Sequence, residues 1–293
     1  MGHEGRFTFT PFSGRAPKGA ASCDGLVDGA AIDLSHWPKN HTPAALKRDT
    51  SVEIALAYLD AGGDLSVVTN NHFDADGVLA VFALLEPDVA RAHADLLIAA
   101  AEVGDFDEWP KDERGLRLEA AVRALAQGVE DDVAYLRVLP ELRAIVSHLD
   151  AREDLWGPAW NNLVHVEERA ARGDLMVERV DDIAVFVHRF DLAEVPGPIL
   201  SRRAGNARRR LLAFERDGGF DYLYELPRYA WADTVQRESL RAPSRNACAR
   251  ALGKGWVLKG GLGMTGIVRT KFPIATRPLD VARTLASVEA NAL

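Results

Sequence analysis

Two local patterns in the first half of the chain predict a helix followed by a buried strand. Thr50 is followed three residues later by Glu53, the spacing of a capping box, so we expect a helix to begin there and run to about Asp60. The glycine pair at 62–63 then ends the helix. The β-branched run from Leu65 to Thr69 predicts a short buried strand.

A second strand is expected after this one, across a helical connection. The apolar run over residues 78–85 predicts a buried helix packed on a sheet, and Pro87 begins another helix that reaches about Ala92. The run over residues 96–101 predicts the second parallel strand, which ends near Asp105. Together these segments form one βαβ unit of a parallel sheet.

The remaining sequence changes character twice. Apolar residues recur at helical spacing over residues 115–173, and Pro140 and Pro158 are expected to divide this stretch into three helices. From residue 182 onward the pattern predicts β structure, with a strand over 183–187 and a hairpin over 210–226.

Short elements are expected to complete the C-terminal region. Residues 244–252 predict a helix with Ser244 as its N-cap. Strands at 256–258 and 267–269 flank a glycine-rich turn, and residues 280–293 predict a terminal helix.

The fold class that follows is α/β with two domains. We expect an N-terminal parallel-sheet domain over residues 1–176, which contains the helical segment 115–173, and a smaller α+β domain over residues 177–293. A chain of 293 residues is long enough for two such domains.

Composition and net charge indicate which cellular compartment and which binding partners to expect. The chain is 47% hydrophobic and 27% charged, which is typical of a folded soluble protein. Its net charge of −8 does not attract phosphate backbones at long range, so we expect no binding of duplex nucleic acid. Two distant cysteines, no apolar run of membrane length and no secretion signal at the N-terminus predict a cytoplasmic protein without a membrane partner.

The strongest chemical signal is the acidic loop after the strand that ends at Thr69. It carries His72, Asp74 and Asp76 at every second position, followed by Gly77 at the start of a helix. Ligands bind at this edge of open α/β sheets, and alternate residues of an extended segment point the same way. Carboxylate oxygens with one imidazole suit Mn²⁺, or Mg²⁺, better than a thiol-seeking metal.

This loop resembles the first motif of the DHH phosphoesterase superfamily, a His-x-Asp-x-Asp-Gly type sequence that binds two metal ions, usually manganese. His72, Asp74 and Asp76 match it residue by residue, and Asp105 matches the position of the family's second motif. The resemblance implies a phosphoester or phosphoanhydride hydrolase in which these four residues are metal ligands. It is specific over residues 64–107 only, and the Asp-His-His motif that names the family is absent.

The rest of such a site has to come from residues with weaker signals. His165 is a reserve metal ligand on a predicted helix, and Arg203 and Arg208 belong to the main basic cluster, which would bind a substrate phosphate unless it pairs with nearby acids. The superfamily resemblance also suggests Gly260 and Gly261 as a substrate-binding turn.

Two residues with competing interpretations remain open. Asp74 and Asp76 would also serve as caps of the following helix, although one carboxylate would suffice for that. His36 lies in a rigid Ser-His-Trp-Pro turn, and we favour packing over catalysis because nothing in the sequence connects it to the acidic loop.

Two functions follow from these residues. The first is a metal-dependent hydrolase that acts on a phosphorylated small molecule or nucleotide, with His72 and Asp76 closest to the chemistry. The second is a non-catalytic metal- or ligand-binding protein on a degenerate phosphoesterase scaffold. They are distinguished by whether a histidine from elsewhere, such as His148, His165 or His188, joins the loop.

Overall fold

The structure is a computed structural model that describes residues 7–189, 195–259 and 265–290. It divides into two compact units, one made of residues 1–161 with 232–238 and the other of residues 162–231 with 239–293. The division lies earlier than the predicted boundary after residue 176, because α7 (Glu153–Ala171) is one continuous helix that contributes to both units. The return of residues 232–238 to the first unit has no counterpart in the predicted scheme.

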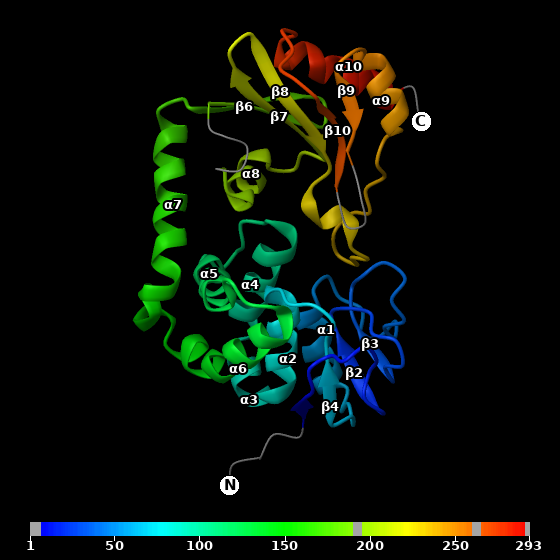
Figure 1. Cartoon of the computed structure of the whole chain (residues 1–293), viewed down its shortest axis with the longest axis vertical. Helices are drawn as coiled ribbons and strands as arrows, with labels where there is room; N and C mark the ends of the chain where they lie inside the picture. The colour runs from blue at the N-terminus through cyan, green and yellow to red at the C-terminus, as the bar shows by residue number, and fades with distance from the viewer. Residues whose placement is uncertain (1–6, 190–194, 260–264, 291–293) are drawn as a thin grey trace. The chain divides into compact units, whose positions relative to one another are not determined.

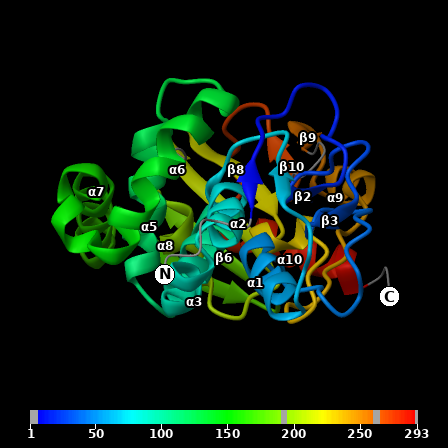
Figure 2. The ribbon, with the colours of Figure 1, turned by 90° about the horizontal axis from the view of Figure 1, so that it is seen from below.

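A four-stranded parallel sheet forms the centre of the first unit. Its strands are β1 (Thr8–Phe9), β2 (Ala20–Cys23), β3 (Ile32–Leu34) and β4 (Val67–Thr69), in the order β1-β4-β2-β3. Figures 1 and 2 show β2, β3 and β4 side by side, with α1 and α2 next to them. Because all four strands are parallel, their carboxyl ends lie at one edge of the sheet.

Helices α1 (Ser51–Asp60) and α2 (Ala75–Leu85) pack against this sheet. Helices α3 (Pro87–Ala92) and α4 (Ala94–Phe106) pack in turn against α1 and α2. The predicted capping box is present, since Thr50 accepts from the Glu53 amide and the Glu53 side chain accepts from the Thr50 amide. The middle of α2 is buried almost all round, as expected of a helix packed between a sheet and other helices.

The predicted second strand at residues 96–101 is wrong, because these residues belong to α4. Four of the thirteen residues of α4 are alanine, and alanine favours helix over strand. The strands that do neighbour β4 are β1 and β2, and β2 and β3 lie between residues 20 and 34, where the sequence pattern indicated no strand. Strands of three or four residues are too short for alternation to reveal them.

The helical segment expected over residues 115–173 is confirmed. It contains α5 (Arg114–Ala126), α6 (Asp131–Ser147), a 3₁₀ turn (Leu149–Arg152) and α7. Pro140 and Pro158 lie inside α6 and α7 and do not divide the segment. A proline removes one backbone hydrogen bond, but the buried face of α6 continues on both sides of Pro140 and keeps the helix together.

The second unit contains a mixed six-stranded sheet in the order β5-β6-β7-β8-β10-β9. Its strands are β5 (Leu175–Val180), β6 (Ile183–His188), β7 (Arg209–Arg216), β8 (Gly219–Glu225), β9 (Trp256–Leu258) and β10 (Gly266–Thr270). The helices of this unit, beside the end of α7, are α8 (Gly197–Ala204), α9 (Arg245–Leu252) and α10 (Pro278–Ala290). The predicted strand at 183–187, the hairpin over 210–226 and the helix capped by Ser244 are confirmed.

The fold class is therefore α/β, with a parallel sheet near the N-terminus and a mixed sheet later in the chain. Among the helices that the structure describes, none combines the length and apolar character needed to cross a membrane.

Candidate metal centre

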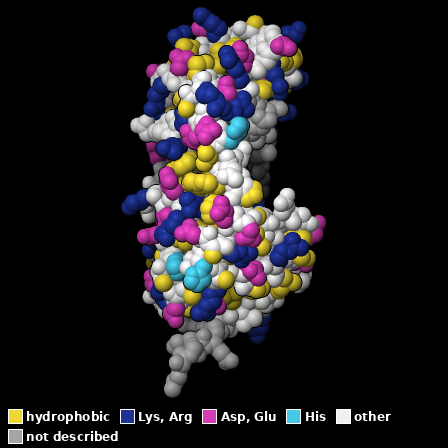
Figure 3. Space-filling view, turned by 90° about the vertical axis from the view of Figure 1, so that its left-hand side faces the viewer, with side chains coloured by type: hydrophobic (Ala, Val, Ile, Leu, Met, Phe, Trp, Pro, Cys, Tyr) yellow, Lys and Arg dark blue, Asp and Glu magenta, His cyan; other side chains and the backbone are white. Residues whose placement is uncertain are grey.

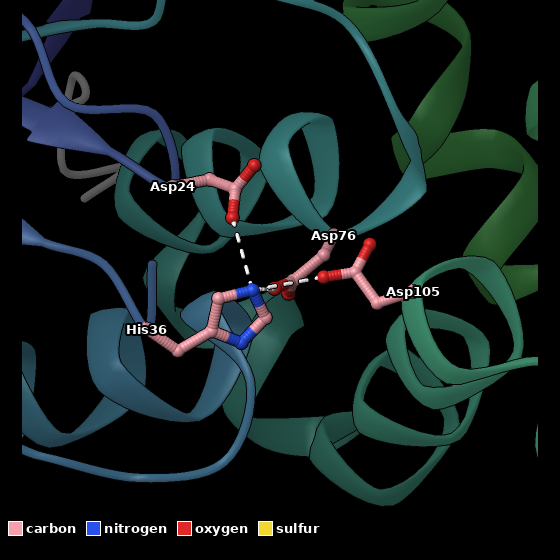
Figure 4. Close-up of side chains that lie close together, drawn as sticks. All are labelled: Asp24, His36, Asp76 and Asp105. Carbon is pink, nitrogen blue, oxygen red and sulfur yellow. Dashed lines mark ion pairs between the residues drawn. The ribbon is translucent and has the colours of Figure 1, made fainter. Parts of the chain in front are cut away.

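Four side chains meet at the carboxyl edge of the parallel sheet. Asp24 directly follows β2, His36 follows β3, and Asp76 lies in the first turn of α2 after β4. Asp105 comes from the last turn of α4. Figure 4 shows the three carboxylates pointing toward the His36 ring from these separate segments.

The His36 ring nitrogen Nε2 lies among the three carboxylates. It is 2.9 Å from Asp105 Oδ2, 3.6 Å from Asp24 Oδ1 and 3.9 Å from Asp76 Oδ2. One potential ligand atom from each residue lies within 4.8 Å of the others, and the four side chains are at most 6% exposed. We call Asp24, His36, Asp76 and Asp105 the buried ligand set.

A second set of potential ligands shares Asp24. His72 Nε2 lies 2.7 Å from Asp24 Oδ2 and 3.0 Å from Asp74 Oδ2. The His72 and Asp74 side chains are 23% and 36% exposed, so we call Asp24, His72 and Asp74 the exposed ligand set. The two oxygens of Asp24 thus face different sets, the arrangement expected of a carboxylate that joins two cation sites.

A backbone carbonyl fixes the orientation of His36. Its Nδ1 lies 2.6 Å from the carbonyl oxygen of Asp49, and a carbonyl can only accept a hydrogen bond. Nδ1 therefore carries the proton and donates it, which directs Nε2 at the carboxylates. Metal-binding histidines commonly make this kind of contact through their second nitrogen.

Asp76 also has a structural role. Its two carboxylate oxygens accept from the backbone amides of Ser51, at 2.6 Å, and Val52, at 2.8 Å, at the start of α1. The Ser51 hydroxyl donates to Asp24 Oδ1 at 2.8 Å. The N-terminus of α1, which favours negative charge, is thereby joined to two members of the buried ligand set.

Two glycines allow the strand-end loops to approach each other. A Cβ at Gly25 would lie 2.0 Å from Asn71 Oδ1 and 2.9 Å from His72 Nδ1, so a larger residue would displace these side chains of the acidic loop. A Cβ at Gly77 would lie 2.6 Å from Asn70 Nδ2. Asp24 itself has a φ of 66°, a left-handed conformation that is uncommon outside glycine and is enriched at functional sites.

Two of the three buried carboxylates, Asp76 and Asp105, lack sufficient positive charge around them. Burial, together with the charges of Asp105 and Asp24, raises the pKa of Asp76 well above its ordinary value. Burial and the charge of Asp74 raise the pKa of Asp105 to about 7. In the absence of metal the site therefore retains protons that a divalent cation would displace.

The pKa values of His36 and His72 rise, although burial alone would lower them. Burial lowers the pKa of His36, but its hydrogen bond to Asp105 outweighs this effect and the pKa rises to about 10. The pKa of His72 rises to about 11, against the effect of burial, because it is paired with Asp24 and Asp74. Burial would raise the pKa of Asp24, but the hydrogen bond from His72 outweighs it and the pKa falls.

The structure brings together all four of the ligands expected from the acidic loop and its surroundings. His72 and Asp74 belong to the exposed ligand set, whereas Asp76 lies in the first turn of α2 and faces the buried ligand set, so the three loop residues do not point to one position as the alternating pattern predicted. Asp74 is also the N-cap of α2, since its Oδ1 accepts from the Gly77 amide at 2.8 Å, and Asp105 comes from a helix end rather than from the end of a strand. Sequence reasoning missed Asp24 altogether and favoured packing for His36. The available signal was positional, since both residues follow short strands whose carboxyl ends adjoin the acidic loop.

The other candidate residues lie outside both ligand sets. His165 is on the part of α7 that belongs to the second unit, and neither set that the described residues form includes it. Arg203 pairs with Glu167, and Arg208 lies 3.7 Å from Asp182, so these arginines contact acids of their own unit. Figure 3 likewise shows basic and acidic side chains interspersed on the face in view. Gly260 and Gly261 lie outside the described residues.

A cavity of about 250 Å³ adjoins the exposed ligand set. Its lining includes His72, Asn70 and Asn71, aromatic side chains such as Phe9 and Tyr135, and the acidic residues Glu130, Asp131 and Asp132. Tyr135 accepts a hydrogen bond of 2.8 Å from Asn70 and stacks on Phe9, which holds this part of the lining together. His72 lines this cavity, and the four residues of the buried ligand set are not among its lining residues.

These features define an α/β protein with a candidate two-part metal centre at the carboxyl edge of its parallel sheet. The chain belongs to a family of unknown function, DUF6687, which matches residues 5–255 and so includes every residue of both ligand sets. No curated protein and no solved structure matches the chain.

Proposed function

We propose that this protein is a metal-dependent hydrolase of phosphoesters or phosphoanhydrides. The observation that carries the proposal is the position of Asp24, whose two oxygens face two sets of potential ligands, one buried and one exposed. Each set combines carboxylates with one imidazole, a donor set that suits Mn²⁺ and related divalent ions and also accommodates Mg²⁺. Phosphoester chemistry is the reaction class that uses such paired sites most widely.

The resemblance of His72, Asp74 and Asp76 to the first motif of the DHH superfamily supports the same reaction class. The absent Asp-His-His motif leaves that family pattern short of histidine ligands, and His36 offers an imidazole from another segment. His148, His165 and His188, the histidines considered from the sequence, are in neither ligand set. The proposed relative is therefore divergent, with part of its ligand set supplied by other strands.

Each side chain has a defined part in this proposal. His36, Asp76 and Asp105 would hold one cation, His72 and Asp74 would hold the other, and Asp24 would contact both. The cations would supply Lewis-acid activation of water and of the phosphoryl oxygen. Asn71 and His72 face the cavity, so they would contact a substrate that enters there, which we expect to be a phosphorylated small molecule or nucleotide.

The test is hydrolysis by purified protein with added Mn²⁺ or Mg²⁺. Substrates should include p-nitrophenyl phosphate, its bis-ester, pyrophosphate and nucleotides. Asp24→Asn should reduce turnover at least about 100-fold, since it alters both sets. Asp95→Asn, at the exposed start of α4, is the matched control and should retain activity. Metal-independent turnover, or full activity of Asp24→Asn, would refute the proposal.

A second function has its own support in the burial of one ligand set. With side chains at most 6% exposed, Asp24, His36, Asp76 and Asp105 would enclose a cation that no substrate reaches. A protein that binds metal for stability, on a scaffold that has lost its phosphoesterase activity, would have such a site. Tight metal binding without turnover of any phosphorylated compound in the panel would favour this alternative.

A further inference from the structure

Residues 232–238 return to the first unit after the chain has passed through the second. We call this segment the strap. The Asp49 carboxylate accepts from three successive strap amides, those of Val235 at 2.6 Å, Gln236 at 2.8 Å and Arg237 at 3.2 Å. Asp49 is 1% exposed, and these hydrogen bonds outweigh the effect of its burial and lower its pKa. The strap is therefore anchored to a buried, ionised carboxylate.

The Arg237 side chain extends this anchor to α4. Its guanidinium donates to Asp49 Oδ2 at 2.6 Å, to Glu102 Oε1 at 2.7 Å and to both oxygens of Glu108, at 3.0 and 2.6 Å. It also lies 4.6 Å from the centre of the Phe106 ring. Glu102 and Glu108 lie on either side of Asp105 in the sequence, so the guanidinium fixes the end of the helix that carries this ligand.

The same strap also holds His36. The carbonyl of Asp49 accepts the His36 Nδ1 hydrogen bond, and the amide of Asp233 in the strap donates to the His36 carbonyl at 2.7 Å. The Phe106 ring, which stacks under Arg237, lies 5.7 Å from the His36 ring. Two ligands of the buried set, His36 and Asp105, are thus each connected to the strap.

We propose that the strap, through Arg237 as a positioning residue, sets His36 and Asp105 in the geometry that binds the buried metal ion. This inference rests on the proposed function for the presence of a metal ion. Four of the five guanidinium donor directions are used by three carboxylates, a pattern that a planar fork satisfies and a lysine ammonium does not. The buried set is then complete only when a segment more than 120 residues after Asp105 has docked.

Metal affinity tests this proposal without any need for a substrate. Binding of Mn²⁺, and of Co²⁺ for its ligand-sensitive absorption, should be titrated for wild type, Arg237→Gln and Arg237→Lys. Loss of a residue that holds a metal ligand in place typically lowers metal affinity about 10–100-fold. We expect this loss at one of the two sites in Arg237→Gln, and a smaller loss in Arg237→Lys. The Co²⁺ spectrum should change with it, because His36 would no longer be held in place.

Two controls separate positioning from general weakening of the fold. Arg143→Gln removes another arginine of the first unit, which pairs with Glu86 on its surface. Val138→Ala removes apolar volume from the fully buried face of α6, away from the strap. Both should retain wild-type affinity to within about twofold. Unchanged affinity in Arg237→Gln, or equal losses in Val138→Ala, would overturn the proposal.

A metal-free measurement keeps the test independent of the proposed function. The His36 Nδ1 proton, held by the Asp49 carbonyl, should give a slowly exchanging signal in the NMR spectrum of the wild-type protein. Its exchange should accelerate in Arg237→Gln and not in the controls. If wild type binds no metal, the proposed function fails, and this measurement alone decides the role of the strap. Equal exchange in wild type and Arg237→Gln would overturn that role.

Discussion

The metal-free protein should lose stability as the pH rises from about 6 to 8.5. Asp105 has an ordinary pKa of 3.8 and a folded pKa of about 7, and His36 has an ordinary value of 6.5 and a folded value of about 10. Both residues have a higher pKa in the folded protein than in the unfolded chain. At any pH between the unfolded and the folded pKa of a residue, the folded protein therefore binds more protons. Stability falls with pH wherever the folded state holds the excess of protons.

The magnitude follows from the size of this excess. Asp105 supplies most of the excess from this pair below pH 7 and His36 most of it above, so these two residues alone give the folded state about one extra proton throughout the range. His72, whose folded pKa is raised to about 11, adds to this excess in the same direction. One proton corresponds to about 1.4 kcal/mol for each pH unit, so Asp105 and His36 contribute a loss of about 3–4 kcal/mol between pH 6 and 8.5, and the total loss with His72 is larger. That is a large part of a typical unfolding free energy of about 5–15 kcal/mol.

Urea denaturation with a chelator, and again with saturating Mn²⁺, measures this directly. A bound cation replaces the protons as countercharge, so the fall in unfolding free energy with pH should disappear with Mn²⁺. Mn²⁺ should therefore raise the unfolding free energy more at pH 8.5 than at pH 6. Asp105→Asn lacks its own titration and the carboxylate that raises the pKa of His36, so its decline should be shallower over the whole range, whereas Asp95→Asn should follow wild type. A metal-free stability that is constant or rises over this range, or the same decline with and without Mn²⁺, would refute the reasoning.

Four substitutions give further predictions. Asp76→Ala leaves two buried amides of α1 without an acceptor and should lower the unfolding free energy by roughly 2–6 kcal/mol in urea denaturation, and wild-type stability would contradict the capping role. Asp74→Asn alters only the exposed set and should reduce the metal content without abolishing it, so complete loss would argue against two sets. Gly25→Ala should weaken Mn²⁺ binding about tenfold in titration calorimetry by displacing the Asn71 and His72 side chains, and unchanged affinity would contradict a role for their present positions. His165→Ala should leave metal content and hydrolysis unchanged, and a loss of either would return it to the site.

Sequence reasoning succeeded where the controlling interactions are local. The capping box at Thr50 lies within four residues, and the hairpin between β7 and β8 depends on the turn that joins them. The acidic loop was found for the same reason, because His72, Asp74 and Asp76 are close in sequence.

Asp24 and His36, the two residues of the buried ligand set that the sequence pattern did not indicate, depend on contacts between distant segments. Asp24 and His36 become neighbours of the acidic loop only because β2 and β3 pair beside β4, and these strands are too short to show an alternating pattern. Asp105 was expected at a strand end and reaches the same place from a helix, since α4 ends beside the sheet edge. The role of Arg237 depends on the return of the strap, which no local pattern indicates.

The metal content of wild type and Asp24→Asn, measured side by side, tests the central claim most directly. Both proteins would be loaded with Mn²⁺, freed of excess ions by dialysis and analysed by plasma mass spectrometry, with Asp95→Asn as the control. Because Asp24 belongs to both ligand sets, we predict near-stoichiometric metal in wild type and the control, and almost none in Asp24→Asn. Absence of metal from wild type, or equal metal in wild type and Asp24→Asn, would contradict a metal centre built around this carboxylate.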